Sequence, residues 1–233
     1  MNKNIHLANE RGGANYDWLK TKYSFSFADY YNPARMGFGK IRVLNDDIIA
    51  PGAGFDTHPH DNMEIITIPL SGELAHKDST GSEEVIAPGQ IQVMSAGSGI
   101  QHSEYNHSKT KDLKLFQIWI ETSQENVEPR HKTKTFNLEK NKLVKIVAGD
   151  KNPDTLFIYQ DASIWLSDFN QAIKLSFETS PPRGAFILVI EGSAKIENEI
   201  LNKRDSIEIE DTNNIQLEVN ENTKLLLIDT PIS

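Results

Sequence analysis

The sequence predicts an all-β protein with two domains of similar plan. Short segments rich in β-branched and aromatic residues recur between turn signals, a spacing typical of sandwiches and barrels. Several segments alternate apolar and polar residues, as in SIEIE at 206–210, so that every apolar side chain falls on one face of a sheet. No convincing amphipathic helix of about 12 or more residues is present.

The predicted strands follow one another along the whole chain. They cover residues 40–44, 64–70, 90–94, 114–121, 144–147, 156–159, 163–166, 173–177, 186–191, 206–210, 215–219 and 225–229. Residues 16–22 are the best short helix candidate, although this segment fits an irregular arm equally well.

A polar stretch divides the chain into two halves. Residues 122–142 contain Pro129 and few large apolar groups, which indicates a connection between a first domain at 1–128 and a second at 129–233. Residues 68–74 (IPLSGEL) resemble residues 188–194 (LVIEGSA), each an apolar strand that ends in a glycine turn. The offset, 192 minus 72, is 120 residues.

Composition excludes several classes of function. The net charge of -9 disfavours direct binding to nucleic acid or to anionic membranes. The absence of cysteine excludes disulfides, thiolate metal sites and cysteine nucleophiles. The N-terminus lacks the apolar region of a secretory signal, and no apolar run is long enough to span a bilayer. We therefore expect a cytoplasmic protein, and we expect a monomer.

The histidines are confined to one half of the chain. All 7 lie within the first 131 residues, so chemistry that uses imidazole is expected in the first domain. At the offset of the repeat, Glu178 and Ser180 occupy the positions that match His58 and His60. The second domain is therefore expected to repeat the fold without the site.

Two short motifs in the first half could together form a metal site. In a strand, His58 and His60 point to the same side, and so do His102 and Glu104. An H-x-H pair alone is weak evidence, because two surface histidines two residues apart are common. Together the motifs offer three imidazole nitrogens and one carboxylate, which suits a divalent first-row metal with one or two open coordination positions.

Longer blocks around these motifs resemble a known family. GAGFDTHPHDNMEIITIPLSG at 52–72 and the stretch from Gly89 to Asn106 look like the two cupin motifs. These blocks, with FSFADYYNP at 25–33 and LFQIWIE at 115–121, are similar to the pirin family of bicupins. The resemblance implies two tandem cupin barrels (double-stranded β-helix or jelly roll), of which the first binds metal and the second lacks the ligands.

The resemblance also implies roles for individual residues. In many cupins Glu64 would be a ligand, whereas pirins use the glutamate two residues after the third histidine. Glu64 then becomes a supporting or structural residue. Glu104 is also the expected catalytic base. The expected ligands are His58, His60, His102 and Glu104, and the expected lining of the substrate pocket is Phe55, Phe116 and Gln117.

Other candidate residues are expected to lie outside the site. His76 is expected to be exposed or structural, nothing is expected of His6 and His131, and Trp119 is expected to pack in the core.

Three functions follow from such a centre. Bacterial pirins are similar to quercetin 2,3-dioxygenases, which cleave flavonols with O2 and release carbon monoxide, so the first expectation is an oxygenase of aromatic or enol compounds. The second is a metal-dependent redox-sensing protein or transcription cofactor that acts through a protein partner without turnover. The third is a cupin isomerase or decarboxylase. Fe(II) is the expected metal, with Mn, Ni, Co, Cu and Zn as alternatives.

Overall fold

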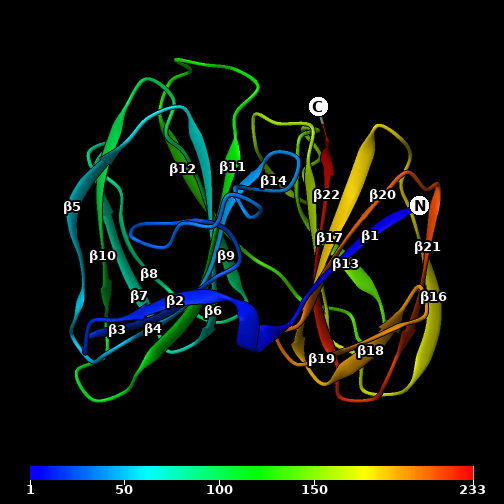
Figure 1. Cartoon of the computed structure of the whole chain (residues 1–233). Coiled ribbons are helices and arrows are strands. Elements are labelled where there is room, and N and C mark those ends of the chain that lie inside the picture. Colours follow the sequence, from blue (N-terminus) through cyan, green and yellow to red (C-terminus); the bar gives the residue numbers. More distant parts are fainter. Residues whose placement is uncertain (233) are drawn as a thin grey trace.

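The computed structural model describes residues 1–232 and shows two β-barrels side by side (Figure 1). Each barrel combines a seven-stranded sheet with a four-stranded sheet. The prediction of an all-β fold of two similar barrels is confirmed. Within the described residues the one helical element is a short 3-10 helix at Ala8–Glu10, and none of them forms a helix long and apolar enough to cross a membrane.

The first barrel is formed by eleven consecutive strands. They are β2 (Gly12–Asn15), β3 (Leu19–Tyr23), β4 (Ile41–Ile49), β5 (Gly54–His60), β6 (Met63–Ser71), β7 (Leu74–Asp78), β8 (Glu83–Ile86), β9 (Gln90–Ser95), β10 (Ile100–Asn106), β11 (Leu113–Glu121) and β12 (Arg130–Thr135). The large sheet has the order β12-β9-β6-β11-β4-β3-β2, and the small sheet has the order β5-β10-β7-β8.

The second barrel takes its strands from both ends of the chain. They are β1 (Asn2–His6), β13 (Leu143–Ala148), β14 (Leu156–Phe157), β15 (Ser163–Ser167), β16 (Ile173–Glu178), β17 (Arg183–Glu191), β18 (Ser193–Ile196), β19 (Glu199–Asn202), β20 (Ser206–Glu210), β21 (Asn214–Val219) and β22 (Lys224–Pro231). The large sheet has the order β1-β20-β17-β22-β15-β13-β14, and the small sheet has the order β16-β21-β18-β19.

The two barrels repeat one plan except in the edge strands of the large sheets: β9-β6-β11-β4-β3 corresponds to β20-β17-β22-β15-β13, and β5-β10-β7-β8 corresponds to β16-β21-β18-β19. Strand β6 corresponds to β17, and the hairpin that follows each begins with a glycine of positive φ, +82° at Gly72 and +78° at Gly192. A Cβ atom at either position would lie within 3 Å of atoms of the facing segment, so both the backbone angle and the close approach favour glycine. The repeat with an offset of 120 residues is therefore a structural one.

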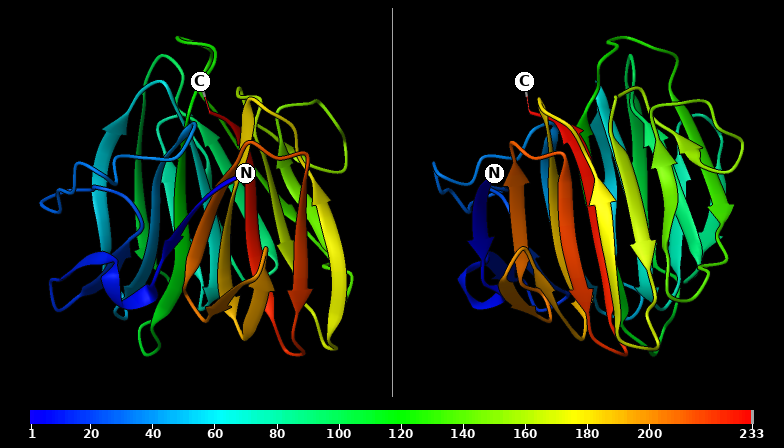
Figure 2. Two further views of the ribbon diagram at one scale, coloured as in Figure 1. Left: turned by 45° about the vertical axis from the view of Figure 1, so that its right-hand side comes forward. Right: turned by 90° about the vertical axis from the view of Figure 1, so that its right-hand side faces the viewer.

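The expected domain boundary at residues 128 and 129 does not coincide with the barrels. Strand β12 lies inside the expected connection and pairs with β9, so the first barrel continues to Thr135. Strand β1 pairs with β20 and so belongs to the second barrel, as the blue strand beside the orange ones shows (Figure 2). Both are edge strands with one pairing partner. An edge strand tolerates charged residues because one side of it is open to solvent. Neither β1 nor β12 therefore shows the alternation of apolar and polar residues from which strands are predicted.

The helix candidate at 16–22 is also wrong. The segment enters strand β3, whose residues are alternately buried and exposed. Leu19, Thr21 and Tyr23 face the interior of the first barrel, and the two lysines between them face solvent. This period of two is the signature of a half-buried strand.

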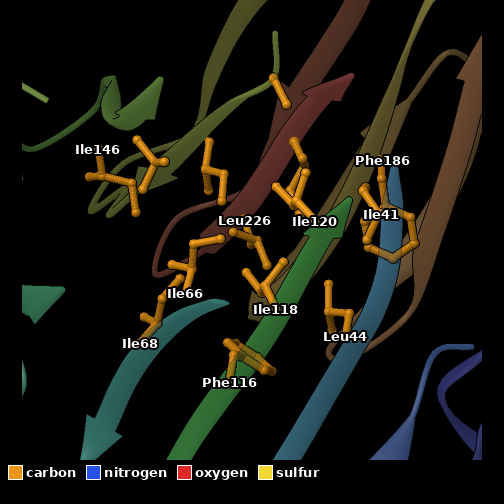
Figure 3. Close-up of a cluster of buried hydrophobic side chains, with 14 of the residues drawn as sticks. Ile41, Leu44, Ile66, Ile68, Phe116, Ile118, Ile120, Ile146, Phe186 and Leu226 are labelled. Atoms are coloured by element: carbon orange, nitrogen blue, oxygen red, sulfur yellow. The ribbon is translucent and has the colours of Figure 1, made fainter. Parts of the chain in front are cut away.

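The largest hydrophobic core lies between the two barrels rather than inside either one. Apolar residues from the outer faces of the two large sheets meet there, including Ile66, Phe116 and Ile118 from the first and Phe186 and Leu226 from the second (Figure 3). Each large sheet is thus buried on both faces, and the two barrels form one packed body.

The interiors of the barrels differ in polarity. The second barrel encloses one apolar cluster of fifteen buried side chains. The first encloses two small apolar clusters, of six and four buried side chains. The rest of its interior contains polar side chains, among them His58, His76 and His102. In the second barrel Phe177, Ile215 and Leu217 fill the space between the corresponding strands β16 and β21.

Candidate metal centre

Strands β5 and β10 bring three histidines together inside the first barrel. The two strands are antiparallel, and His102 lies directly opposite His58. Candidate ligand nitrogens of His58, His60 and His102 all lie within 4.8 Å of one another. The ring centroids are 4.4 to 4.9 Å apart. Three imidazoles at these separations can bind one ion.

Glu104 lies beside this cluster, on the same face of β10 as His102. The register between β5 and β10 shifts between these two residues, so that Glu104 pairs with Phe55. On the other side of β10, Glu104 lies opposite His76. His76, His102 and Glu104 form a second group whose ligand atoms lie within 4.8 Å of one another, so His102 belongs to both groups.

Burial favours the neutral form of His60 and His102. It lowers the pKa of His60 to about 4 and that of His102 to about 2, and repulsion from neighbouring imidazoles adds to the effect. His58 Nδ1 lies 2.7 Å from the carbonyl oxygen of Asp56, which can only accept a hydrogen bond. Nδ1 therefore carries the proton, and Nε2 has the free lone pair that a metal needs.

The residues fit a divalent metal. Both ring nitrogens of His102 are buried, and neither has a hydrogen-bond partner among the described residues. Buried polar atoms are normally paired, and a metal would take one of these nitrogens. Imidazole and carboxylate donors without thiolate suit Fe, Ni, Cu, Mn, Co or Zn.

The carboxyl group of Glu104 is held by two donors. Gln117 Nε2 donates to Oε2, and Thr67 Oγ1 donates to Oε1 at 3.5 Å. Burial raises the pKa of Glu104 to about 7, and the hydrogen bond from Gln117 opposes that rise. A carboxyl group with such a pKa can both accept and release a proton near neutral pH.

Glu64 lies on the other face of its strand. Side chains along β6 point alternately to the two faces of the sheet. Thr67 therefore reaches Glu104 inside the barrel, whereas Glu64 faces the second barrel. Ser95 Oγ donates to Glu64 Oε2 at 2.7 Å, and Arg130 lies close enough to lower its pKa, which burial raises. Glu64 belongs to neither group of candidate ligands among the described residues.

A cavity of about 190 Å³ opens beside the histidines. Of the three residues expected to line it, Phe55 and Gln117 do so. Phe116 does not: it is fully buried in the core between the barrels, with the guanidinium of Arg204 over its ring. The physical reason is the period of two along β11, since adjacent residues point to opposite faces and Gln117 occupies the inner one. The complete lining is Leu19, Thr21, Tyr23, Phe27, Asn45, Asp47, Phe55, His58, His60, Glu104, Gln117 and Trp119.

The sequence interpretation missed Trp119. This residue lines the cavity, its ring lies edge-on to His60 with centroids 4.9 Å apart, and its Nε1 donates to Gln117 Oε1 at 3.2 Å. Trp119 thus orients the amide of Gln117, which in turn donates a hydrogen bond to Glu104. Its position two residues after Gln117, on the same face of β11, was the available signal.

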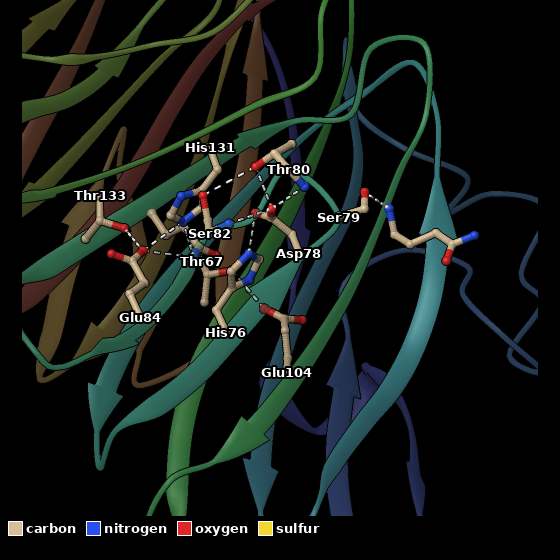
Figure 4. Close-up of polar contacts among 12 residues, drawn as sticks. Thr67, His76, Asp78, Ser79, Thr80, Ser82, Glu84, Glu104, His131 and Thr133 are labelled. Atoms are coloured by element: carbon tan, nitrogen blue, oxygen red, sulfur yellow. Dashed lines mark hydrogen bonds and ion pairs between the residues drawn. The ribbon is translucent and has the colours of Figure 1, made fainter.

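A second missed feature is a buried polar cluster around His76 and His131 (Figure 4). His76 is fully buried, with Nε2 at 3.0 Å from Asp78 Oδ2, and its ring stacks on that of His131 with centroids 4.7 Å apart. His131 Nε2 lies 2.7 Å from Glu84 Oε1. His76 is therefore buried and not exposed, and the expectation for His131, which lies on strand β12, is corrected.

Comparison with known proteins matches both halves of the chain. Residues 4–120 match the family model described as Pirin, and residues 145–230 match one described as Quercetinase C-terminal cupin domain. The chain is 38% identical over 227 residues to the quercetin 2,3-dioxygenase of Escherichia coli K12, covering 97% of this chain and 98% of that protein. It is 37% identical over 221 residues to a pirin-like protein of Caulobacter vibrioides, covering 94% and 95%.

Solved structures agree with these matches. The crystal structure of YhhW from Escherichia coli has a TM-score of 0.96 and 36% identity, and covers 99% of this chain and 98% of that one. A crystal structure of bacterial pirin YhhW in complex with nickel(II) has a TM-score of 0.95 and 36% identity, and covers 99% of this chain and 100% of that one. The chain therefore belongs to the pirin family, and its two barrels are a pair of cupin barrels.

Proposed function

We propose that this protein is a metal-dependent dioxygenase of the quercetin 2,3-dioxygenase type, which cleaves flavonols or related enol compounds with O2. The observation that carries the proposal is the opening of the three-histidine cluster onto a cavity walled by Tyr23, Phe27 and Trp119. Aromatic walls favour a flat aromatic ligand. The name of the Escherichia coli relative supports the same activity.

The proposed ligands are the three histidines and Glu104, and Fe(II) is the proposed metal. A bound divalent metal would supply a Lewis acid that polarises the enol oxygen atoms of the substrate. The nickel(II) complex of YhhW supports a divalent ion of this class. Mn, Co, Cu and Zn suit the same donors.

Glu104 is proposed as the general base. The cavity lining includes Glu104, so a hydroxyl group bound there can approach the carboxylate. Gln117 and Thr67 keep the carboxyl group in place while it gains the hydroxyl proton. Both atoms of O2 enter the cleaved product, and one ring carbon leaves as carbon monoxide.

Oxygen consumption with quercetin tests the proposal. The protein is stripped of metal and reloaded anaerobically with Fe(II), with parallel samples in Mn, Ni, Co and Cu, and metal content is measured for each. We expect uptake of O2 by the wild type and its loss in His102→Ala. His107→Ala is the matched control, because this exposed histidine belongs to neither ligand group and should leave uptake unchanged.

Two other outcomes would replace the proposal. Full metal occupancy without O2 uptake for any metal would favour a metal-dependent redox-sensing protein or transcription cofactor that acts through a protein partner. Product formation without O2 uptake would indicate an isomerase or decarboxylase.

A further inference from the structure

The wall of the cavity formed by β3 and β4 carries a set of polar side chains that the proposed chemistry does not use. Thr21 lies directly opposite Asp47 in the pairing of these strands. Asn45 lies opposite Tyr23 on one side and opposite Gln117 on the other. We call Thr21, Asn45 and Asp47 the Asp47 corner. All three line the same cavity as His58 and Glu104.

The Asp47 corner is buried, and each of its three side chains has one oxygen atom without a hydrogen-bond partner among residues 1–232. Thr21, Asn45 and Asp47 are 4%, 5% and 3% exposed. Thr21 Oγ1, Asn45 Oδ1 and Asp47 Oδ1 have no hydrogen-bond partner among residues 1–232. By contrast, Gln117 in the same sheet uses both atoms of its amide, for Glu104 and for Trp119.

Burial of polar atoms without partners is unfavourable, and it is most unfavourable for a carboxyl group. Three such residues on one wall of one cavity therefore point to a ligand that completes their hydrogen bonds. Asp47 Oδ1 and Asn45 Oδ1 are acceptors, and the Thr21 hydroxyl can donate or accept. Acceptors of this kind select a ligand that presents an O–H group.

We propose that the Asp47 corner is a substrate subsite that binds a hydroxyl group of a flat aromatic ligand, away from the oxygen atoms held at the histidines. The inference rests on the proposed function in taking the ligand to be a flavonol. It deepens that function by naming the substrate class: polyhydroxylated aromatic enols, in preference to the same ring system without further hydroxyl groups. Asp47 is then a specificity-determining residue.

The discrimination has a direct physical cause. A ligand that brings a hydroxyl group to Asp47 pairs a buried acceptor, whereas a ligand without one displaces solvent and leaves the acceptor unpaired. The loss of one such hydrogen bond corresponds to about tenfold in affinity.

Binding measured without turnover tests the subsite separately from the oxygenase. The protein is loaded with Ni(II), kept free of O2, and titrated with quercetin and with 3-hydroxyflavone, which lacks the further hydroxyl groups. Quenching of tryptophan fluorescence reports binding, because Trp119 lines the cavity. We expect the wild type to bind quercetin about tenfold or more tightly than 3-hydroxyflavone. Asp47→Leu should reduce this preference to about twofold or less, mainly by lowering the affinity for quercetin.

Two variants make the test decisive. Asp47→Asn keeps the shape of the side chain and should show an intermediate preference, so it decides the matter if Asp47→Leu does not fold. Asp46→Asn is the matched control. Asp46 is the next residue along β4, points away from the cavity to Arg11 and Arg204, and should keep the full preference.

The outcomes separate the two proposals. A preference for quercetin that is lost with Asp47, in a protein that consumes no O2, supports the subsite and refutes the oxygenase. Equal binding of the two compounds by the wild type, binding of neither, or an undiminished preference in the foldable Asp47 variants overturns the subsite.

Discussion

Replacing Asp47 by asparagine should stabilise the protein at alkaline pH, although Asp47 lies in the proposed substrate site. Burial raises the pKa of this carboxyl from 3.8 to about 7, and the charge of Asp46 adds to the rise. Ionisation of Asp47 is therefore much easier in the unfolded chain than in the folded one. Asparagine has nearly the same shape and does not ionise.

The magnitude follows from the shift in pKa. Because the folded pKa lies above the unfolded one, the stability associated with the protonated carboxyl is complete below pH 3.8 and is lost as the pH rises through about 7. Asp47→Asn should therefore raise the free energy of unfolding by about 4 kcal/mol at pH 8 and by less than about 1 kcal/mol near pH 4. A gain in stability at a site kept for function is the expected trade-off.

The assay is urea unfolding of the metal-free protein between pH 4 and pH 8, followed by tryptophan fluorescence. Protonation of His60 and His102 also changes stability in this range, because burial lowers the pKa of both. These contributions are the same in wild type and variant, so they cancel in the difference. Asp46→Asn is the control of opposite sign: it breaks contacts of 3.2 Å to Arg11 and 2.9 Å to Arg204. Asp46→Asn should lower the free energy of unfolding by about 1–3 kcal/mol.

Two results would refute the reasoning. One is a loss of stability in Asp47→Asn at pH 8. The other is a gain of equal size at pH 5 and pH 8, because a gain that does not depend on pH cannot come from ionisation.

Three further changes test the metal centre and the core. Glu104→Gln should weaken metal affinity by about 10–100-fold in competition with a chelator, whereas Glu64→Gln should stay within about twofold; the reverse order would move the ligand to Glu64. Gln117→Leu removes the amide that donates to Glu104 and should weaken metal affinity by about tenfold, and unchanged affinity would show that this hydrogen bond does not position the carboxylate. Phe186→Ala in the core between the barrels should cost about 3–5 kcal/mol in urea unfolding, and a loss below about 1 kcal/mol would contradict a tightly packed interface.

The predictability of each strand depended on its surroundings. All twelve predicted strands are present, because apolar alternation or a continuous apolar run marks a strand that is buried on at least one face. The missed strands are short or polar. Strands β1 and β12 lie at sheet edges, where charged residues meet solvent, and β5 and β10 carry polar residues into the barrel. In β5 and β10 successive side chains alternate between the two faces of the strand, but they do not alternate between apolar and polar.

For the residues of the metal centre, too, the sequence predicted only what a local pattern specifies. The spacing of two in H-x-H and H-x-E is local information, so each pair could be assigned to one face of a strand from the sequence. The same rule, applied to β11, separates Gln117 from Phe116. Asp47 could not be singled out in this way, because Asp46 and Asp47 look alike in the sequence. One pairs with arginines and the other enters the cavity.

The sequence by itself determined the class of fold, the duplication, the confinement of imidazole chemistry to the first half and the faces of individual strands. These properties depend on periodicity and composition, which act over a few neighbouring residues. Only the tertiary structure decided which faces meet. Glu64 faces the second barrel, His131 pairs with Glu84 in the buried cluster around His76, and Asp47 lines the same cavity as Glu104. The reason is that strand register and barrel closure join residues that are far apart along the chain, and no local pattern specifies those distances.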